Sequence, residues 1–425
     1  MQEQFLHYLW KYRLYKPGLY STTQGEPLEI IHPGLHNTDS GPDFFNAKIK
    51  IGDTLWAGNV EIHQKTSDWN RHGHQTNAAY DNVILHVVAQ HDLEVANSSG
   101  VLIPSWEMPI DDRPLKNYET LLKNQNWIAC APYLEKINPL ELYNWIERMT
   151  IEKLEGKIAI IRQMLEQYQN NWDEVFYLIL VRNFGFGINS QPFEQLARNT
   201  PWIIILKNND NLPRLEALFL GQAGFLSNLI YEDDYVQLLQ REYKFLTKKY
   251  HLTALPQHHW KFLRLRPSNF PTIRLVQLAR LFYNGNISFS RVLQVASKED
   301  LTVLFTIEAG DYWNTHYRPG AESANHTKHL GKSSVELLLI NTIVPMLFAY
   351  GKLRGYESLC NQAISWLEST KPESNNIIHG WNKSGIIANH AGHSQGLVYL
   401  KQQYCQHRKC LHCRIGHLVI SKQNR

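Results

Sequence analysis

Two neighbouring stretches of the sequence alternate apolar and polar residues, and this alternation constrains the fold more than any other feature. The stretches are residues 44–51, FFNAKIKI, and residues 55–64, LWAGNVEIHQ, with Gly52-Asp53 between them. The apolar positions of the first stretch are Phe45, Ala47, Ile49 and Ile51. Side chains two positions apart in a strand point to the same face. The pattern therefore predicts a β-hairpin with one buried face and a turn at Gly52-Asp53.

The predicted hairpin carries ionisable side chains at positions suited to catalysis. Asp43 precedes the first strand, and Glu61 and His63 share one face of the second. Mg²⁺ prefers oxygen ligands and activates water for attack on a phosphate, with help from a neighbouring basic group. We therefore expect Asp43 and Glu61 to hold Mg²⁺, and His63 or Lys65 to assist in proton transfer.

These residues resemble the motif of the PD-(D/E)xK nuclease superfamily. Pro42-Asp43 corresponds to its first half and Glu61-Ile62-His63 to its second, with His63 where that superfamily has lysine. The resemblance implies a metal-dependent nuclease that hydrolyses phosphodiester bonds in DNA or RNA. Because His63 stands in place of that lysine, two alternatives to a nuclease remain open. One is a non-catalytic scaffold for nucleic acid or protein; in the other, Glu61 pairs with a lysine across the hairpin and has only a structural role.

Histidines close to the hairpin allow a different chemistry. His63, His72 and His74 lie within twelve residues, and His86 follows on the next predicted strand. Imidazole nitrogens suit Zn²⁺ or iron better than Mg²⁺. A metal site at His63, His72 and His74 would make the protein a histidine-based metal hydrolase, which is a second alternative function.

The rest of the chain predicts an α+β fold in three parts. An amphipathic segment at 3–16, a short strand at 27–33 and a β-branched run at 83–90 complete a small α/β sheet domain, residues 1–110. Beyond it the apolar residues recur with the helical period, so residues 111–400 form a mainly helical domain. Residues 401–425 form a Cys/His-rich C-terminal segment.

Charge is distributed unevenly along the sequence. Residues 1–107 hold twelve acidic and seven basic side chains, whereas residues 241–291 hold ten basic and one acidic. Four basic residues of the second region lie among aromatic ones and are candidate contacts for nucleic acid. They are Lys261, Arg264, Arg266 and Arg274. The alternative is that these charges cap helices or lie on unrelated solvated faces.

Three cysteines and a histidine crowd the C-terminal segment. Cys405, Cys410, Cys413 and His417 are separated by four, two and three residues, a spacing that suits a structural Zn²⁺ site. An iron–sulfur cluster would need a fourth cysteine, from Cys130 or Cys360. The remaining alternative is a helix with buried free thiols.

Further stretches of the sequence extend this interpretation. The cysteine count, together with the absence of a signal peptide or an apolar run of eighteen residues, predicts a cytoplasmic protein that is not membrane-bound. The oligomeric state stays open.

Nearly the whole sequence resembles a bacterial family known as domain of unknown function 2851, through AGNVEIHQKTSDWNRHGH, RNFGFGIN and LFLGQAGFL. That resemblance implies a shared architecture and no particular activity.

Overall fold

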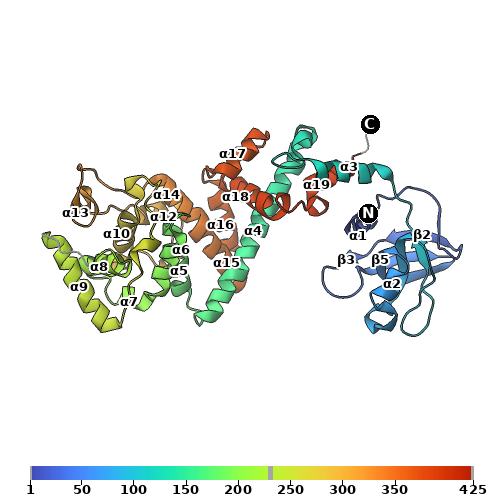
Figure 1. Ribbon diagram of the computed structural model, residues 1–425, viewed down its shortest axis with the longest axis horizontal. Helices are drawn as coiled ribbons and strands as arrows, with labels where there is room; N and C mark the ends of the chain where they lie inside the picture. Colours follow the sequence, from blue (N-terminus) through green and yellow to red (C-terminus); the bar gives the residue numbers. More distant parts are fainter. Residues whose placement is uncertain (1, 228–232, 423–425) are drawn as a thin grey trace. The chain divides into compact units, whose positions relative to one another are not determined.

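The computed structural model describes residues 2–227 and 233–422, which form two compact units (Figure 1). Unit 1 contains the residues up to Trp145 and those from Lys401 on, and unit 2 contains Ile146–Leu400. The helix α4, Pro139–Gln167, begins in unit 1 and continues into unit 2. This division differs from the predicted one, because residues 111–145 and the Cys/His-rich segment belong with the sheet.

A seven-stranded sheet forms the centre of unit 1. Its strands are β1 (Tyr20–Ser21), β2 (Pro27–His32), β3 (Leu35–His36), β4 (Phe44–Ile51), β5 (Thr54–Lys65), β6 (Val83–Gln90) and β7 (Ser105–Glu107). Their order is β1-β2-β4-β5-β6-β7, and β3 also pairs with β4. The pairs up to β4–β5 are antiparallel, whereas β5–β6 and β6–β7 are parallel. The predicted hairpin is confirmed, with Ile51 paired to Thr54 across Gly52-Asp53.

The first hairpin strand departs from simple alternation at one point. Its pairing with β5 shifts between Phe44 and Ala47, and Asn46 has φ 56°. This irregularity adds a residue to one strand, so Phe44, and not Phe45 as predicted, joins the fully buried face with Ala47. On β5 both faces are buried from Val60 to His63, which includes Glu61 and His63, whereas Leu55 and Ala57 on the same face as Glu61 are exposed.

Unit 1 also contains helices. They are α1 (Glu3–Tyr12), α2 (Asp68–Arg71), α3 (Asp112–Lys123) and α19 (Arg414–Ile420), with short 3₁₀ helices η1 (His74–Thr76), η2 (Ala78–Tyr80), η3 (Ala131–Lys136) and η9 (Cys410–His412). Helix α1 buries Leu6, Leu9 and Trp10 completely and ends at Arg13, whose φ of 52° is left-handed. The predicted N-terminal helix is therefore present, and its apolar face lies in the core of unit 1.

Gly58 on β5 lies where no larger side chain fits. A Cβ atom at this position would be 2.4 Å from Ile84 Cγ2 and 2.8 Å from the carbonyl oxygen of Asn82. We expect Gly58→Ala to destabilise unit 1 by about 1–3 kcal/mol, because the parallel strands β5 and β6 must separate to relieve the clash. Faster hydrogen–deuterium exchange of the β5 and β6 amides in Gly58→Ala would show this destabilisation. Gly18→Ala, where a Cβ meets nothing within 4 Å, is the matched control, and equal exchange in both variants would contradict the expectation.

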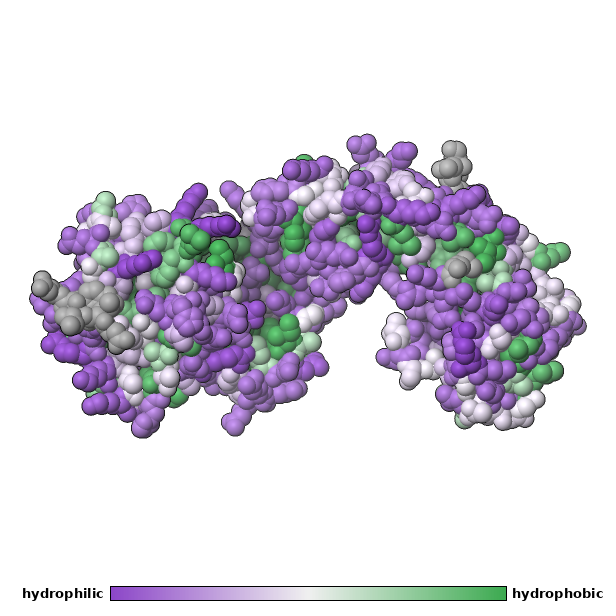
Figure 2. Space-filling view, in the orientation of Figure 1, coloured by the Kyte–Doolittle hydropathy of each residue, from purple (hydrophilic) through white to green (hydrophobic). Residues whose placement is uncertain are grey.

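Unit 2 is almost entirely helical, as predicted. It contains α5 (Trp172–Phe184), α6 (Ser190–Arg198), α7 (Trp202–Leu206), α8 (Leu212–Gln222), α9 (Asp234–Tyr250), α10 (Pro271–Phe282), α11 (Phe289–Val292), α12 (Lys298–Leu304), α13 (Asp311–Asn314), α14 (Lys332–Leu338), α15 (Val344–Arg354), α16 (Glu357–Glu368), α17 (Asn376–Lys383), α18 (Ala391–Tyr399) and one small hairpin, β8 (His316–Arg318) with β9 (Ala321–Glu322). These helices enclose one large apolar core. On the side of unit 2 seen in Figure 2, hydrophilic residues predominate and apolar ones form separate small groups.

One helical stretch of unit 2 is apolar enough to resemble a membrane span. Residues Lys332–Arg354 have a mean hydropathy of 1.5 in their most apolar window, and 78% of that window is buried inside the structure. The stretch joins α14 and α15 through a π-helical turn, Leu339–Ile343. Burial of this kind is what a core helix of a folded domain shows.

Candidate metal centre

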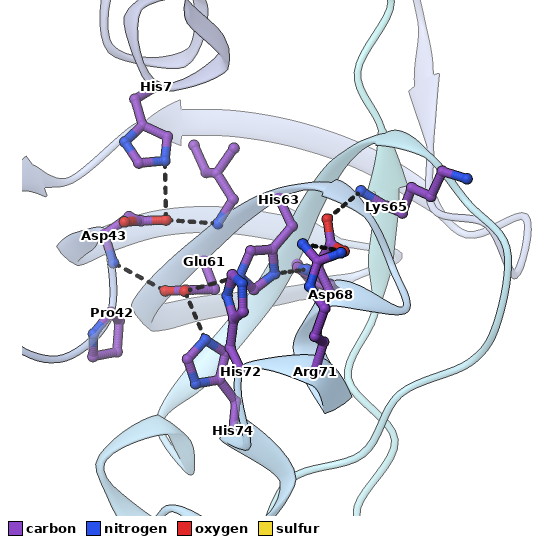
Figure 3. A network of polar contacts seen from close by, with 12 residues as sticks. His7, Pro42, Asp43, Glu61, His63, Lys65, Asp68, Arg71, His72 and His74 are labelled. Carbon is purple, nitrogen blue, oxygen red and sulfur yellow. Dashed lines mark hydrogen bonds and ion pairs between the residues drawn. The ribbon is translucent and has the colours of Figure 1, made fainter. Parts of the chain in front are cut away.

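A buried carboxylate, Glu61, lies at the centre of a polar cluster in unit 1 (Figure 3). Its Oε1 atom is 3.1 Å from His74 Nε2 and 3.4 Å from His63 Nε2. Its Oε2 atom accepts a hydrogen bond of 3.1 Å from the backbone N–H of Asp43. Burial raises the pKa of Glu61, although the hydrogen bond from His74 lowers it. One oxygen is thus held by the backbone, while the other faces the imidazoles.

Three imidazoles converge on the same point. The donor atoms of His63, His72 and His74 all lie within 4.8 Å of one another, and His72 Nδ1 is 3.1 Å from His63 Nε2. His63 and His74 are buried, whereas His72 is exposed. The cluster therefore has a buried wall and one side that solvent can reach.

The loop after β5 brings His72 and His74 to Glu61. The Asp68 carboxylate accepts a hydrogen bond of 3.1 Å from the Lys65 backbone N–H, which fixes the start of α2. Gly73 follows α2 with φ 77°, a conformation that favours glycine. This turn places His72 and His74 on the same side of the loop, although only one residue separates them.

A fourth histidine supports the cluster from behind. His63 Nδ1 is 2.9 Å from His86 Nε2, and the two residues lie on neighbouring parallel strands. Burial, followed by the neighbouring imidazoles, lowers the pKa of His63 to about 2 and that of His86 to about 3. Both rings are therefore neutral at physiological pH. If His63 donates its Nδ1–H to His86, its Nε2 lone pair faces Glu61 and His72.

The spacing of these donors suits a tetrahedral metal ion. Ligands at about 2.0–2.1 Å from Zn²⁺ in a tetrahedron are about 3.3–3.4 Å from each other. The separations of 3.1 and 3.4 Å between Glu61 Oε1 and the two Nε2 atoms are close to that value. A ligand histidine usually hydrogen-bonds through its other nitrogen, as His63 does with His86. Imidazoles with one carboxylate favour Zn²⁺ or iron over Mg²⁺.

The Asp43 carboxylate makes a separate set of contacts. Its Oδ2 atom accepts a hydrogen bond of 2.9 Å from the Ile62 N–H and lies 3.3 Å from His7 Nε2 on α1. Burial lowers the pKa of His7, but the hydrogen bond and charge of Asp43 outweigh this and raise it overall. The structure thus brings Asp43 beside Glu61, with one carboxylate oxygen already engaged by the protein.

Sequence reasoning missed His7. It lies one helical turn after Glu3 on α1, and each of these two side chains affects the pKa of the other. The spacing of four residues was the available signal, because it places both side chains on one face of a helix.

The lysines near the hairpin do not join the cluster. Lys65 is exposed, and its side chain extends away from Glu61 (Figure 3). Lys48 and Lys50 are exposed on β4. Glu61 therefore pairs with imidazoles, and the predicted alternative of a lysine pair across the hairpin does not hold.

The candidate nucleic-acid contacts divide into two kinds. Lys261, Arg264 and Arg266 are exposed, as a surface contact requires. Arg274 is only 5% exposed, because it lies on α10, a helix buried on nearly all sides. Its guanidinium lies 4.5 Å from the ring of Phe186. The prediction that Arg274 contacts nucleic acid at the surface is therefore wrong.

His417, which the sequence grouped with the C-terminal cysteines, contacts two tyrosines. Its Nδ1 atom is 3.0 Å from the Tyr8 hydroxyl, and its ring packs on Tyr12 with 4.2 Å between ring centres. Both tyrosines belong to α1, so His417 links α19 to α1. The three cysteines lie in the turn before α19, and all of them are free thiols.

Comparison with known proteins gives one match. A family model described as "Protein of unknown function (DUF2851)" matches residues 3–376. No curated protein and no solved structure matches the chain. The matched residues include the whole polar cluster of unit 1 and end before the C-terminal cysteines.

Proposed function

The chain belongs to the DUF2851 family, and we propose that unit 1 is a metal-dependent hydrolase that cleaves phosphodiester bonds in nucleic acid. The observation that carries the proposal is the position of Glu61 Oε1, which is 3.1 Å from His74 Nε2 and 3.4 Å from His63 Nε2. Together with His72, these side chains offer three imidazole nitrogens and one carboxylate to a divalent cation. Such a cation polarises a phosphoryl group and lowers the pKa of bound water.

The groups around Glu61 have separate roles in this proposal. The Asp43 N–H holds one Glu61 oxygen, so that the other is directed at the histidines. His86 holds the Nδ1 atom of His63. Burial lowers the pKa of His7, but the Asp43 carboxylate raises it overall, which favours the protonated form of His7 beside Asp43. We assign His7 as the proton donor to the leaving oxygen.

The order of the strands supports phosphodiester bonds as the substrate class. The antiparallel strands β2, β4 and β5 are followed by β6, parallel to β5. Asp43 directly before β4 and Glu61 on β5 are the two carboxylates on which the resemblance to the PD-(D/E)xK nucleases rests, and that resemblance supports the proposal. The imidazoles stand where a lysine is expected, so we propose Zn²⁺ or iron, in place of Mg²⁺, as the cation. The exposed basic residues Lys261, Arg264 and Arg266 suit a polyanionic substrate.

The test compares His74→Ala with His32→Ala, an exposed histidine of β2 outside the cluster. Chelator-treated protein is reloaded with Zn²⁺, Fe²⁺ or Mg²⁺ and incubated with labelled single- and double-stranded DNA and RNA. We expect cleavage with Zn²⁺ or Fe²⁺, a loss of at least about 100-fold in His74→Ala, and wild-type rates in His32→Ala.

Two results would overturn the proposal. Cleavage by His74→Ala at the wild-type rate would place the chemistry elsewhere. Tight metal binding that is lost in His74→Ala, without cleavage of any substrate by the wild type, would favour the non-catalytic scaffold.

A further inference from the structure

A loop of unit 2 that has no part in the proposed function adopts an unusual backbone conformation. Residues 182–189, RNFGFGIN, lead from the end of α5 to the start of α6. Phe186 has φ 42°, a left-handed conformation that is rare for a bulky side chain. A Cβ on Gly185 would be 2.4 Å from the backbone nitrogen of Ser190, so only glycine allows this turn. The surrounding structure must therefore hold Phe186 in a strained conformation, which is most often found at functional sites.

Phe186 lines two cavities of unit 2, and so does Leu337, so that the cavities have a common wall. The smaller cavity has a volume of about 230 Å³, which is below the range of sites for drug-sized ligands. Its other walls come from the residues around α10 and from the start of α14, where Ser333 and Ser334 lie. The smaller cavity therefore suits a small group.

Arg274 is the charged residue that lines the smaller cavity, and it is only 5% exposed. Its hydrogen bonds go to neutral acceptors on Asn269, Gln277 and Ser334. Within residues 2–227 and 233–422, no carboxylate forms an ion pair with Arg274. Buried charges in proteins are normally paired with an opposite charge. A cavity lined by such a guanidinium is therefore suited to an anion.

The polar groups around this cavity keep hydrogen-bond donors for an anion. A guanidinium has five N–H groups, of which the hydrogen bonds of Arg274 use three, and its Nε atom has no partner among the described residues. The Phe186 ring lies 4.5 Å from the guanidinium carbon and supports the charge from one face. Ser334 accepts a hydrogen bond from Arg274, so its own hydroxyl hydrogen can be donated to a ligand.

The charges around the two cavities favour a phosphate group over a single carboxylate. The larger cavity, of about 470 Å³, is lined by Lys157, Arg182 and Glu194. Arg182 and Glu194 form an ion pair of 3.0 Å. The residues that line the two cavities thus carry three positive charges and one negative charge, Arg274 included. A phosphate group carries about −1.5 to −2 charges at neutral pH and matches this excess.

We propose that the smaller cavity binds a phosphate group through the Arg274 guanidinium and the hydroxyl groups of Ser333 and Ser334. The phosphate is either the free ion or the end of a small molecule whose remainder enters the larger cavity, where Ile161 and Leu178 offer apolar walls. The site lies within unit 2 and does not depend on the function proposed for unit 1. It gives Arg274 a ligand inside the fold, in place of the predicted contact with nucleic acid at the surface.

Calorimetric titration of the full chain with inorganic phosphate tests the proposal. The protein is first freed of metal with a chelator, so that the histidine cluster offers no cation to phosphate. Arg274→Lys keeps the charge but removes the planar guanidinium, so we expect it to bind phosphate at least about 10-fold more weakly than the wild type. Arg280→Lys is the matched control, because Arg280 is also on α10 but lines neither cavity, and it should keep the wild-type affinity. No binding by the wild type, or equal affinity in all three proteins, would overturn the proposal.

A second measurement uses the wild type alone and does not depend on whether Arg274→Lys folds. Hydrogen–deuterium exchange is compared with and without inorganic phosphate. We expect slower exchange in residues 184–189 and 333–337, which contribute to the walls of the smaller cavity. Slower exchange confined to residues 261–266, which are mostly exposed, would place the phosphate at the surface and refute the site.

Adenosine monophosphate distinguishes the two sources of the phosphate group in the same titration. Tighter binding of the nucleotide than of inorganic phosphate, again weakened in Arg274→Lys, indicates the end of a larger molecule. Equal or weaker binding of the nucleotide indicates the free ion.

Discussion

Glu61→Gln is expected to abolish metal binding at the histidine cluster, with a loss of affinity greater than about 100-fold. In typical metal sites, replacing a residue that only hydrogen-bonds to a ligand already lowers the metal affinity 10- to 100-fold. Glu61 is the single acidic side chain within ion-pair distance of both His63 and His74 among the described residues. Removing its charge leaves a site of imidazoles without an anionic ligand, which holds a divalent cation weakly.

The same substitution should leave the metal-free fold intact. A glutamine carbonyl oxygen still accepts the hydrogen bond from the Asp43 N–H. Burial raises the pKa of Glu61, which means that the charged form is disfavoured without metal. We therefore expect the thermal midpoint of metal-free Glu61→Gln to equal or exceed that of metal-free wild type.

Calorimetric titration with Zn²⁺ measures the affinity directly. Glu94→Gln is the control, since Glu94 also lies beside a histidine, His91 at 3.5 Å, but is exposed and outside the cluster. Wild-type affinity in Glu61→Gln would show that this carboxylate is not a ligand. It would also remove the observation on which the proposed function rests.

Arg274→Ala is expected to lower the free energy of unfolding of unit 2 by about 3–5 kcal/mol. The guanidinium donates to Gln277 Oε1 at 2.9 Å, Asn269 Oδ1 at 2.6 Å and Ser334 Oγ at 3.0 Å. Burial lowers the pKa of Arg274 to about 10, which is still high enough to keep the charge at neutral pH. The alanine variant leaves these polar partners without their donor and opens a space beside Phe186.

Arg266→Ala is the matched control, because Arg266 is exposed on the loop before α10. Its effect on stability should be within about 0.5 kcal/mol. Hydrogen–deuterium exchange of α10 measures both variants separately from unit 1. If nucleic acid binds here, Arg266→Ala also reduces the salt dependence of binding, whereas Arg274→Ala does not. Equal stability of the two variants would contradict the interior role of Arg274.

The parts of the candidate site that sequence could predict were those governed by strand periodicity. Glu61 and His63 were placed on one face of the second strand because side chains in a strand alternate. The irregularity at Asn46 was not foreseen, since a single left-handed residue leaves no trace in the apolar pattern. The grouping of His72 and His74 with His63 was predicted and is found in the structure. The loop conformation that brings them together could not be predicted, because it depends on Gly73 and on the hydrogen bond of Asp68.

Contacts between distant parts of the chain were the least predictable. Lys401 Nζ donates to the carbonyl oxygen of Trp127 across 274 positions, and nothing local to either residue indicates the other. The prediction for Arg274 failed for a different reason. Its apolar neighbours on α10, Leu275 and Val276, could have indicated that the helix is buried, but the surrounding basic residues suggested a surface.

Unit 1 is built from residues that precede unit 2 in the sequence and from residues that follow it. This arrangement has a consequence during synthesis. Residues 401–425 emerge from the ribosome only after the 255 residues of unit 2. At 5–20 residues per second, this delay lasts roughly 10 to 50 seconds. Until then α1, which carries His7, lacks the contacts of Tyr8 and Tyr12 with His417. The nascent chain thus holds the histidine cluster before α1 is fixed by its contacts with His417, so the proposed hydrolytic activity would follow the synthesis of α19.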